Sequence, residues 1–205
     1  MDDRPRILDI TAAVTLITAL VYTAGWSYAY HWYDRFELGL IGLGIPFEYH
    51  FMYGFWVLQT FWWLIPTLVV FLALTYWAQV DPVLDLLART ALIWGLLAFV
   101  LFYYMGKAAA GADYRDHRES GFQSYPWVRI WTISDQGQTS AEPQTAPQDL
   151  ADGKYRLLLQ TTQSLYLIRP RQDSGQLPTL QIPHNQIRAL RRIPTNPGRS
   201  GASSR

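Results

Sequence analysis

The chain has 205 residues, of which 50% are hydrophobic and only 16% are charged, and its formal net charge is +1. The charge is unevenly distributed, since residues 1–106 hold four basic and eight acidic side chains, whereas residues 107–205 hold 13 basic and eight acidic ones. The chain contains no cysteine, which excludes disulfide bonds, thiolate nucleophiles and cysteine-ligated metal sites.

The first predicted element is a membrane-spanning helix over about residues 8–30. Residues 10–30 carry no formal charge, and about 20 apolar residues are enough for a helix to cross the hydrocarbon core of a bilayer. Arg4 and Arg6 precede the apolar run, as in a signal peptide. The run lacks the small residues of a cleavage site at its end and is followed by further apolar segments, so we expect an uncleaved helix.

Two more membrane-spanning helices are predicted over about residues 51–79 and 83–106. Residues 51–80 carry no charge and are long enough for a tilted helix that bends at Pro66. Asp81 and Pro82 then provide the cap and first-turn residue of the next helix. No ionisable residue lies deep in any of these segments, which argues against an ion-coupled carrier. The expected fold class is therefore a three-helix transmembrane domain, residues 1–106, followed by a small β-rich extramembrane domain.

The loop between the first two predicted spans contains an uncharged stretch, "LGLIGLGIPF", that is too short to cross a bilayer. We expect residues 36–47 to form an interfacial or a re-entrant segment. Gly39, Gly42 and Gly44 in this segment are candidates for close helix packing, or for a pore together with Gln59. Their spacing reverses that of the dinucleotide-binding fingerprint and is followed by Pro46, so nucleotide binding is not expected.

Four titratable residues flank the same loop and form a candidate metal site. His31 and Asp34 are three residues apart, and Glu48 and His50 lie at the far end of the loop. Two imidazoles and two carboxylates suit zinc, manganese or iron if the loop brings them together. The same residues also suit the polar ends of membrane helices, and no spacing typical of a metalloenzyme supports the site. No catalytic residue and no cofactor is predicted.

Residues 107–195 form the predicted β-rich domain, followed by a disordered tail at 196–205. Alternating β-branched, aromatic and polar residues predict short strands at 127–133, 154–162, 165–169, 179–182 and 187–193. The polar residues 134–153 are expected to form a mobile loop. The core candidates have apolar side chains at alternating positions: Trp127, Trp131, Tyr155, Leu157, Leu159, Leu165, Leu167 and Ile182.

Arginines account for most of the positive charge of this domain. The candidate residues for binding a partner or a lipid surface are Arg169, Arg171, Arg188, Arg191 and Arg192. A solvated basic face is the alternative. Nucleic acid is not an expected partner, because the aromatic residues alternate as in a strand core and a membrane protein seldom meets nucleic acid.

The tail motifs "YRLLLQTTQSLYLIRP" and "LQIPHNQIRALRRI", placed after several apolar helices, resemble those of small bacterial membrane proteins. This resemblance implies no activity. From the residues themselves we expect a non-enzymatic protein of the bacterial inner membrane, an accessory, assembly or immunity-type component that binds a protein partner, a second copy or the membrane surface. An oligomeric channel subunit and a membrane metalloenzyme are the alternatives. Arg4 and Arg6 favour a cytoplasmic N-terminus and hence a periplasmic sheet domain.

Overall fold

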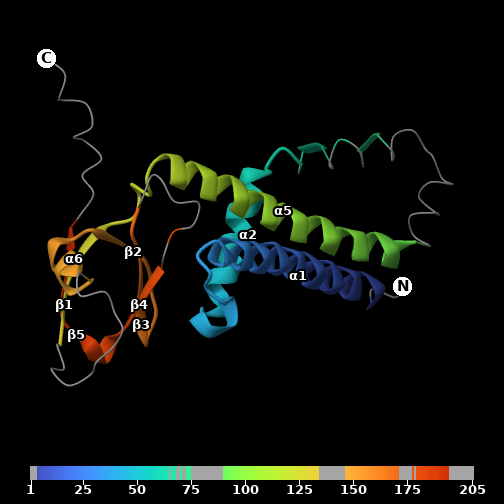
Figure 1. The fold of residues 1–205 in the computed structure, drawn as a ribbon. Helices are drawn as coiled ribbons and strands as arrows, with labels where there is room; N and C mark the ends of the chain where they lie inside the picture. The colour runs from blue at the N-terminus through green and yellow to red at the C-terminus, as the bar shows by residue number, and fades with distance from the viewer. Residues whose placement is uncertain are drawn as a thin grey trace, which may run out of the picture. The chain divides into compact units, whose positions relative to one another are not determined.

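The computed structural model describes residues 4–64, 66–67, 70, 73–74, 90–133, 146–170, 177 and 179–193, with the side chains of the first helix described from Thr11. The chain divides into two compact units (Figure 1). The helical unit comprises residues 1–34 and 39–113, and the sheet unit comprises residues 35–38 and 114–205.

The helical unit contains α1, Arg4–Asp34, the 3-10 helix η1, Leu40–Leu43, α2, Phe47–Thr60, and most of α5, Ala91–Glu119. Within the described residues, two helical stretches, Thr11–Asp34 and Leu92–Glu119, are long and apolar enough to cross a membrane. Only 17% of the apolar stretch of α5 is buried. Its leucine, isoleucine and tryptophan side chains are therefore largely exposed in the isolated chain.

Helices α1 and α2 pack closely because each presents a glycine to the other. A Cβ atom on Gly25 would lie 1.7 Å from the carbonyl oxygen of His50, and one on Gly54 would lie 2.3 Å from the carbonyl oxygen of Val21. Val21 thus contacts Gly54, whereas Gly25, which follows it in α1, contacts His50, which precedes Gly54 in α2. The two helices therefore run in opposite directions at their contact. Tyr28 and Tyr53 stack beside this contact with their ring centroids 5.2 Å apart.

Helix α5 crosses α1 at Gly106, where a Cβ atom would lie 2.3 Å from the carbonyl oxygen of Ala24. The Ser27 hydroxyl donates a hydrogen bond of 2.6 Å to the carbonyl oxygen of Tyr103 at the same crossing. Small residues and a hydroxyl that bonds across helices are typical of helix association in membranes. Both helices run from right to left in Figure 1, that is, in the same direction.

The helix bounds differ from the predicted ones. Helix α2 begins at Phe47 and ends at Thr60, whereas the prediction places one helix over 51–79; residues 65, 68–69, 71–72 and 75–89 of this region lie outside the described residues. Helix α5 continues past Gly106 to Glu119, because the alanine-rich segment after Lys107 favours a helix. It ends before Gly121, whose φ of 62° is left-handed and suits a helix C-terminus.

The sheet unit contains a five-stranded antiparallel sheet with the strand order β4-β3-β2-β1-β5. Its strands are β1, Trp127–Thr132, β2, Tyr155–Gln160, β3, Ser164–Ile168, β4, Thr179–Pro183, and β5, Ile187–Ile193; the 3-10 helix η2, His184–Gln186, joins the last two. The predicted C-terminal antiparallel sheet is thereby confirmed. The order places β5, the last strand, beside β1, the first.

The predicted loop 134–153 contains a helix, α6, Ala146–Asp152, and its remaining residues 134–145 lie outside the described residues. Pro147 stands in the first turn, where the missing backbone N–H costs nothing. Gly153 ends the helix with a φ of 76°. The helix supplies Leu150 to the core, which explains why this polar stretch is ordered at its C-terminal end.

One hydrophobic core cluster of the sheet unit lies on one face of the sheet. It consists of Val128, Ile130, Leu150, Leu157, Leu165, Leu167 and Ile182, with Tyr155, Leu180, Ile187 and Leu190 packed against it. Four of the predicted core residues belong to it and Tyr155 packs against it. Trp127 and Trp131 lie outside it, because β1 buries its valine and isoleucine and turns its two tryptophans to the other face. Leu159 lies outside it as well, because a register shift after Leu157 places it opposite Tyr166.

Candidate binding surface of the sheet unit

The five strands carry five arginines and no acidic residue. Two of these arginines face each other across the β1–β5 ladder, since Arg129 lies directly opposite Arg191. Directly opposite residues project to the same face of an antiparallel pair, with Cα atoms about 4.5–5.5 Å apart. Both side chains are exposed. Like charges in this arrangement destabilise a sheet.

Trp131 belongs to the same face as Arg129, two residues further along β1, and is 41% exposed. Ile133, directly after the strand, is 57% exposed. This face is covered elsewhere, because Thr179 donates a hydrogen bond of 3.1 Å to the carbonyl oxygen of Phe36 and Arg156 donates one of 2.6 Å to that of Tyr125. The part that the described residues leave uncovered is the β1–β5 end, which we call the arginine–tryptophan face: Arg129, Trp131, Ile133, Arg191 and Ile193.

A hollow of about 280 Å³ opens beside this face, lined by Arg129, Arg191, Arg192 and Ile193. Arg192 lies opposite Val128, on the core side of the ladder, and donates a hydrogen bond to the Oε1 atom of Gln160. Among the described residues, the ion pairs join Asp149 and Asp152 to Lys154 and Asp149 to Arg169. None of these pairs includes an arginine of the hollow, although the Arg129 side chain lies against Gly153, between Asp152 and Lys154.

The predicted partner-binding arginines therefore separate into groups. Arg191 and Arg192 line the hollow, and Arg188 is exposed on the same strand near the register shift of the β1–β5 ladder. Arg171 lies outside the described residues. Arg169 instead pairs with Asp149 at 2.9 Å and serves to hold α6 against the sheet.

Asp149 is the anchor of α6. Lys154 Nζ lies 2.5 Å from its Oδ1 atom, and this hydrogen bond, together with the charge of Arg169, holds the pKa of the Asp149 carboxyl below its usual value. The same bond raises the pKa of Lys154. Both cations next to α6 are therefore engaged with this carboxylate, which distinguishes them from the arginines of the hollow.

Arg129 and Arg156 are not among the predicted binding residues, and the structure places them on the same side of the sheet. Arg156 is buried with its guanidinium carbon 4.1 Å from the centroid of the Trp127 ring, and burial lowers the pKa of this side chain. Its Nε atom has no hydrogen-bond partner. Arg156 thus fixes Trp127 on the sheet, whereas Arg129 stays exposed. Their positions follow from strand pairing, which the amino-acid pattern alone does not specify.

The structure does not bring the four candidate metal ligands together. Among the described residues, no group of three or more histidine, cysteine and acidic side chains is close enough to hold an ion. His31 and Asp34 end α1, and the Nδ1 atom of His31 lies 2.9 Å from the carbonyl oxygen of Ser27. His50 is buried in α2 beside the Tyr22 ring, whereas Glu48 is exposed in the first turn of that helix.

The candidate packing glycines of the loop do not contact a neighbour. A Cβ atom on Gly39, Gly42 or Gly44 would meet no atom within 4 Å. Gly44 instead adopts a left-handed φ of 58° at the end of η1 and permits the turn into α2. Gln59 is exposed near the end of α2. Close packing is instead provided by Gly25, Gly54 and Gly106, which lie inside the helices.

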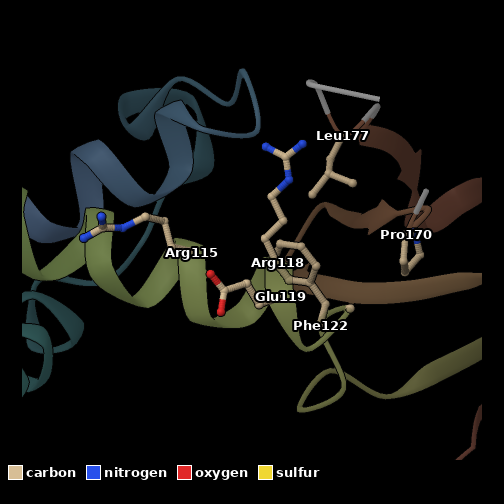
Figure 2. A pocket seen from close by; sticks show the side chains of 7 residues that line it. Arg115, Arg118, Glu119, Phe122, Pro170 and Leu177 are labelled. Carbon is tan, nitrogen blue, oxygen red and sulfur yellow. The ribbon is translucent and has the colours of Figure 1, made fainter. Parts of the chain in front are cut away.

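A second pocket, of about 320 Å³, lies in the sheet unit at the end of α5 (Figure 2). Phe122, Pro170 and Leu177 form its apolar part, and Arg115, Arg118 and Glu119 line it from the helix. Figure 2 shows Arg118 extended toward Leu177, with the Glu119 carboxylate on the same helix turn. Charges of both signs therefore border this pocket, whereas the hollow on β1 and β5 is lined by arginines.

Comparison of the chain with protein-family models, with curated proteins and with solved structures gives no match. The class of the molecule follows from the observations above: helices of membrane-spanning length and composition joined to a small antiparallel sheet with an arginine-rich end.

Proposed function

We propose that this chain is a non-enzymatic multi-pass membrane protein whose sheet unit binds an anionic partner at the membrane surface. The observation that carries the proposal is the arginine–tryptophan face, where Arg129 and Arg191 lie opposite each other on strands without any acidic residue. Such a cluster is electrostatically unfavourable in the free protein and becomes favourable when an anion binds.

The helical unit supports the membrane part of this proposal. The exposed side chains of α5 are mostly apolar, including Leu92, Leu96 and Leu101, and an extended apolar surface of this kind indicates contact with lipid or with another protein. Because α1 and α5 run in the same direction (Figure 1), a chain in which both cross the bilayer must cross it once more between them. Helix α2 runs against α1 and begins this return, which favours the three-span arrangement.

We place the protein in the bacterial inner membrane, with the N-terminus in the cytoplasm and the sheet unit in the periplasm, where it would act as an accessory or assembly component. Arg4 and Arg6, in the first turn of α1, favour this orientation. A reporter fused after Arg205 tests it: alkaline phosphatase should be active there and a fluorescent protein that requires the cytoplasm should not. The reverse result would place the sheet unit inside the cell.

Site-specific photocrosslinking in native membranes tests the binding function. A photoreactive amino acid in place of Trp131 should form an adduct with a protein or a lipid, and the adduct should disappear when Arg129 and Arg191 are both changed to glutamine. The control position is Gln181, exposed on β4 at the opposite edge of the sheet. Any adduct formed there should not respond to the two substitutions. An adduct at position 131 that persists without the arginines would refute the proposal.

A further inference from the structure

We propose that Arg129 and Arg191 bind the phosphate of an anionic phospholipid headgroup, with Trp131 and Ile133 in contact with the lipid next to it. This inference rests on the proposed function and specifies the anion that the sheet unit takes. It assigns Arg129 to the site, although that residue is separated by about 60 positions from Arg191 in the chain and is brought opposite it only by the pairing of β1 with β5.

The arginines of the hollow have no ion-pair partner among the described residues. Two guanidinium groups that project from directly opposite positions repel each other, and a protein can relieve this with a carboxylate nearby. Among the described residues, the ion pairs of the sheet unit are gathered around Asp149 and Lys154, on α6 and the residues after it. The hollow of about 280 Å³ next to Arg129 and Arg191 also has room for more than one anionic oxygen. The site is therefore complete only when an external anion occupies it.

The donor geometry of two neighbouring guanidinium groups suits a phosphate. A guanidinium group presents N–H groups in a planar fork that matches phosphate oxygens in pairs. Arginines on two adjacent strands approach an anion from two sides, so a tetrahedral phosphate can accept from both forks at once. A phosphodiester keeps two such oxygens and one negative charge after it is esterified to glycerol, so a lipid headgroup retains what this site recognises.

The apolar side chains beside Arg129 favour a lipid over an acidic protein as the partner. Trp131 and Ile133 are large apolar side chains, 41% and 57% exposed, and they continue the line of Arg129 along the strand. An indole ring favours the headgroup region, where its apolar surface meets lipid and its N–H meets water. The chain also carries the sheet unit on helices of membrane-spanning length, which keeps lipid at a high effective concentration. Arginine beside exposed tryptophan and isoleucine thus fits a phospholipid better than a row of carboxylates.

The test uses the full-length protein in a neutral detergent and native mass spectrometry with short-chain lipids. Dioctanoyl phosphatidylglycerol should bind more tightly than dioctanoyl phosphatidylcholine. Replacement of one arginine by glutamine, Arg129→Gln or Arg191→Gln, should weaken phosphatidylglycerol binding about fivefold, and replacement of both should weaken it about 25-fold. Lysine at both positions should restore part of the affinity, since it keeps the charge but lacks the planar fork. Arg115→Gln, at the other pocket, is the matched control and should leave binding unchanged.

Two further ligands distinguish the sources of the anion. Inorganic phosphate should compete only weakly, because it lacks the lipid part that Trp131 contacts, and Trp131→Ala should therefore weaken lipid binding without changing phosphate binding. Equal affinity for phosphate and lipid would overturn the headgroup assignment. An oligoglutamate peptide that binds more tightly than the lipid, and loses binding in the double variant, would overturn it as well but keep the proposed function. If the double variant binds both lipid and peptide as the wild type does, both proposals fail.

Discussion

Substitution of Gly25 by alanine should separate α1 from α2. The added Cβ atom would lie 1.7 Å from the carbonyl oxygen of His50 and 2.6 Å from the backbone nitrogen of Gly54, whereas ordinary contact begins at 3.4 Å. Because both obstacles are backbone atoms, no side chain can rotate away, and the helices must move apart by more than 1 Å. Overpacking of this kind costs up to about 3 kcal/mol, against a gain of about 1 kcal/mol from the higher helix propensity of alanine. The expected net loss of stability is about 2 kcal/mol.

The matched control is Gly95→Ala in α5, where the new Cβ atom meets nothing within 4 Å. This variant should be as stable as the wild type or up to about 1 kcal/mol more stable, since only the propensity gain remains. Unfolding of both proteins in mixed micelles, by titration with sodium dodecyl sulfate and detection by far-ultraviolet circular dichroism, measures the two effects. If Gly25→Ala unfolds at the same detergent fraction as Gly95→Ala, the close contact of α1 with α2 is not present and the reasoning is refuted.

Three other substitutions test the remaining parts of the structure. Asp113→Ala should destabilise the helical unit by about 2 kcal/mol in the same titration, because its carboxylate accepts hydrogen bonds of 2.7 Å from α1 and from α2; the exposed Asp116→Ala should not. The stability contributed by Asp149, whose pKa is lowered in the folded state, is present above the ordinary value of 3.8 and should be lost as the pH falls below it. Asp149→Asn should remove this acid dependence of the α6 contact, measured by hydrogen exchange of Lys154. Arg191→Thr should raise the stability of the sheet by about 0.2–1 kcal/mol in the absence of an anion, because it removes the repulsion across the ladder, and thermal unfolding at low salt would show the opposite sign if the arginine were already paired.

The C-terminal sheet could be predicted because period-two patterns and turn residues mark strands locally. Which face of β1 is buried could not be predicted from these patterns. In "WVRIWTI" one face carries Trp127, Arg129 and Trp131 and the other carries Val128 and Ile130. The larger aromatic side chains suggested the wrong face, and the arginine between them, which a core would not accept, was the signal that favours the observed one.

The candidate site could be predicted only in part for a similar reason. Arginines that cluster in the sequence of β5 were visible, and they lie at the candidate surface. Arg129 stands alone in its segment and gains importance only from the register that places it opposite Arg191. Arg169 carries the same guanidinium group but pairs with Asp149. These two residues are 20 positions apart, and no local sequence pattern predicts their contact. Only contacts between residues distant in the sequence therefore show that Arg169 has an ion-pair partner and that Arg129 has none among the described residues.

Strand β5 forms one edge of the sheet, and the side chains on this edge affect whether two copies of the chain can pair there. Proteins confined to a bilayer diffuse in two dimensions and meet their own copies often, and an open strand edge invites them to pair into ribbons. Two β5 edges brought together would place Arg188, Arg191 and Arg192 of one copy close to those of the other, and this repulsion opposes the pairing. The opposite edge, β4, ends at Pro183, which has no backbone N–H to donate. Both edges thus oppose edge-to-edge pairing of the sheet unit when many copies of the chain lie close together.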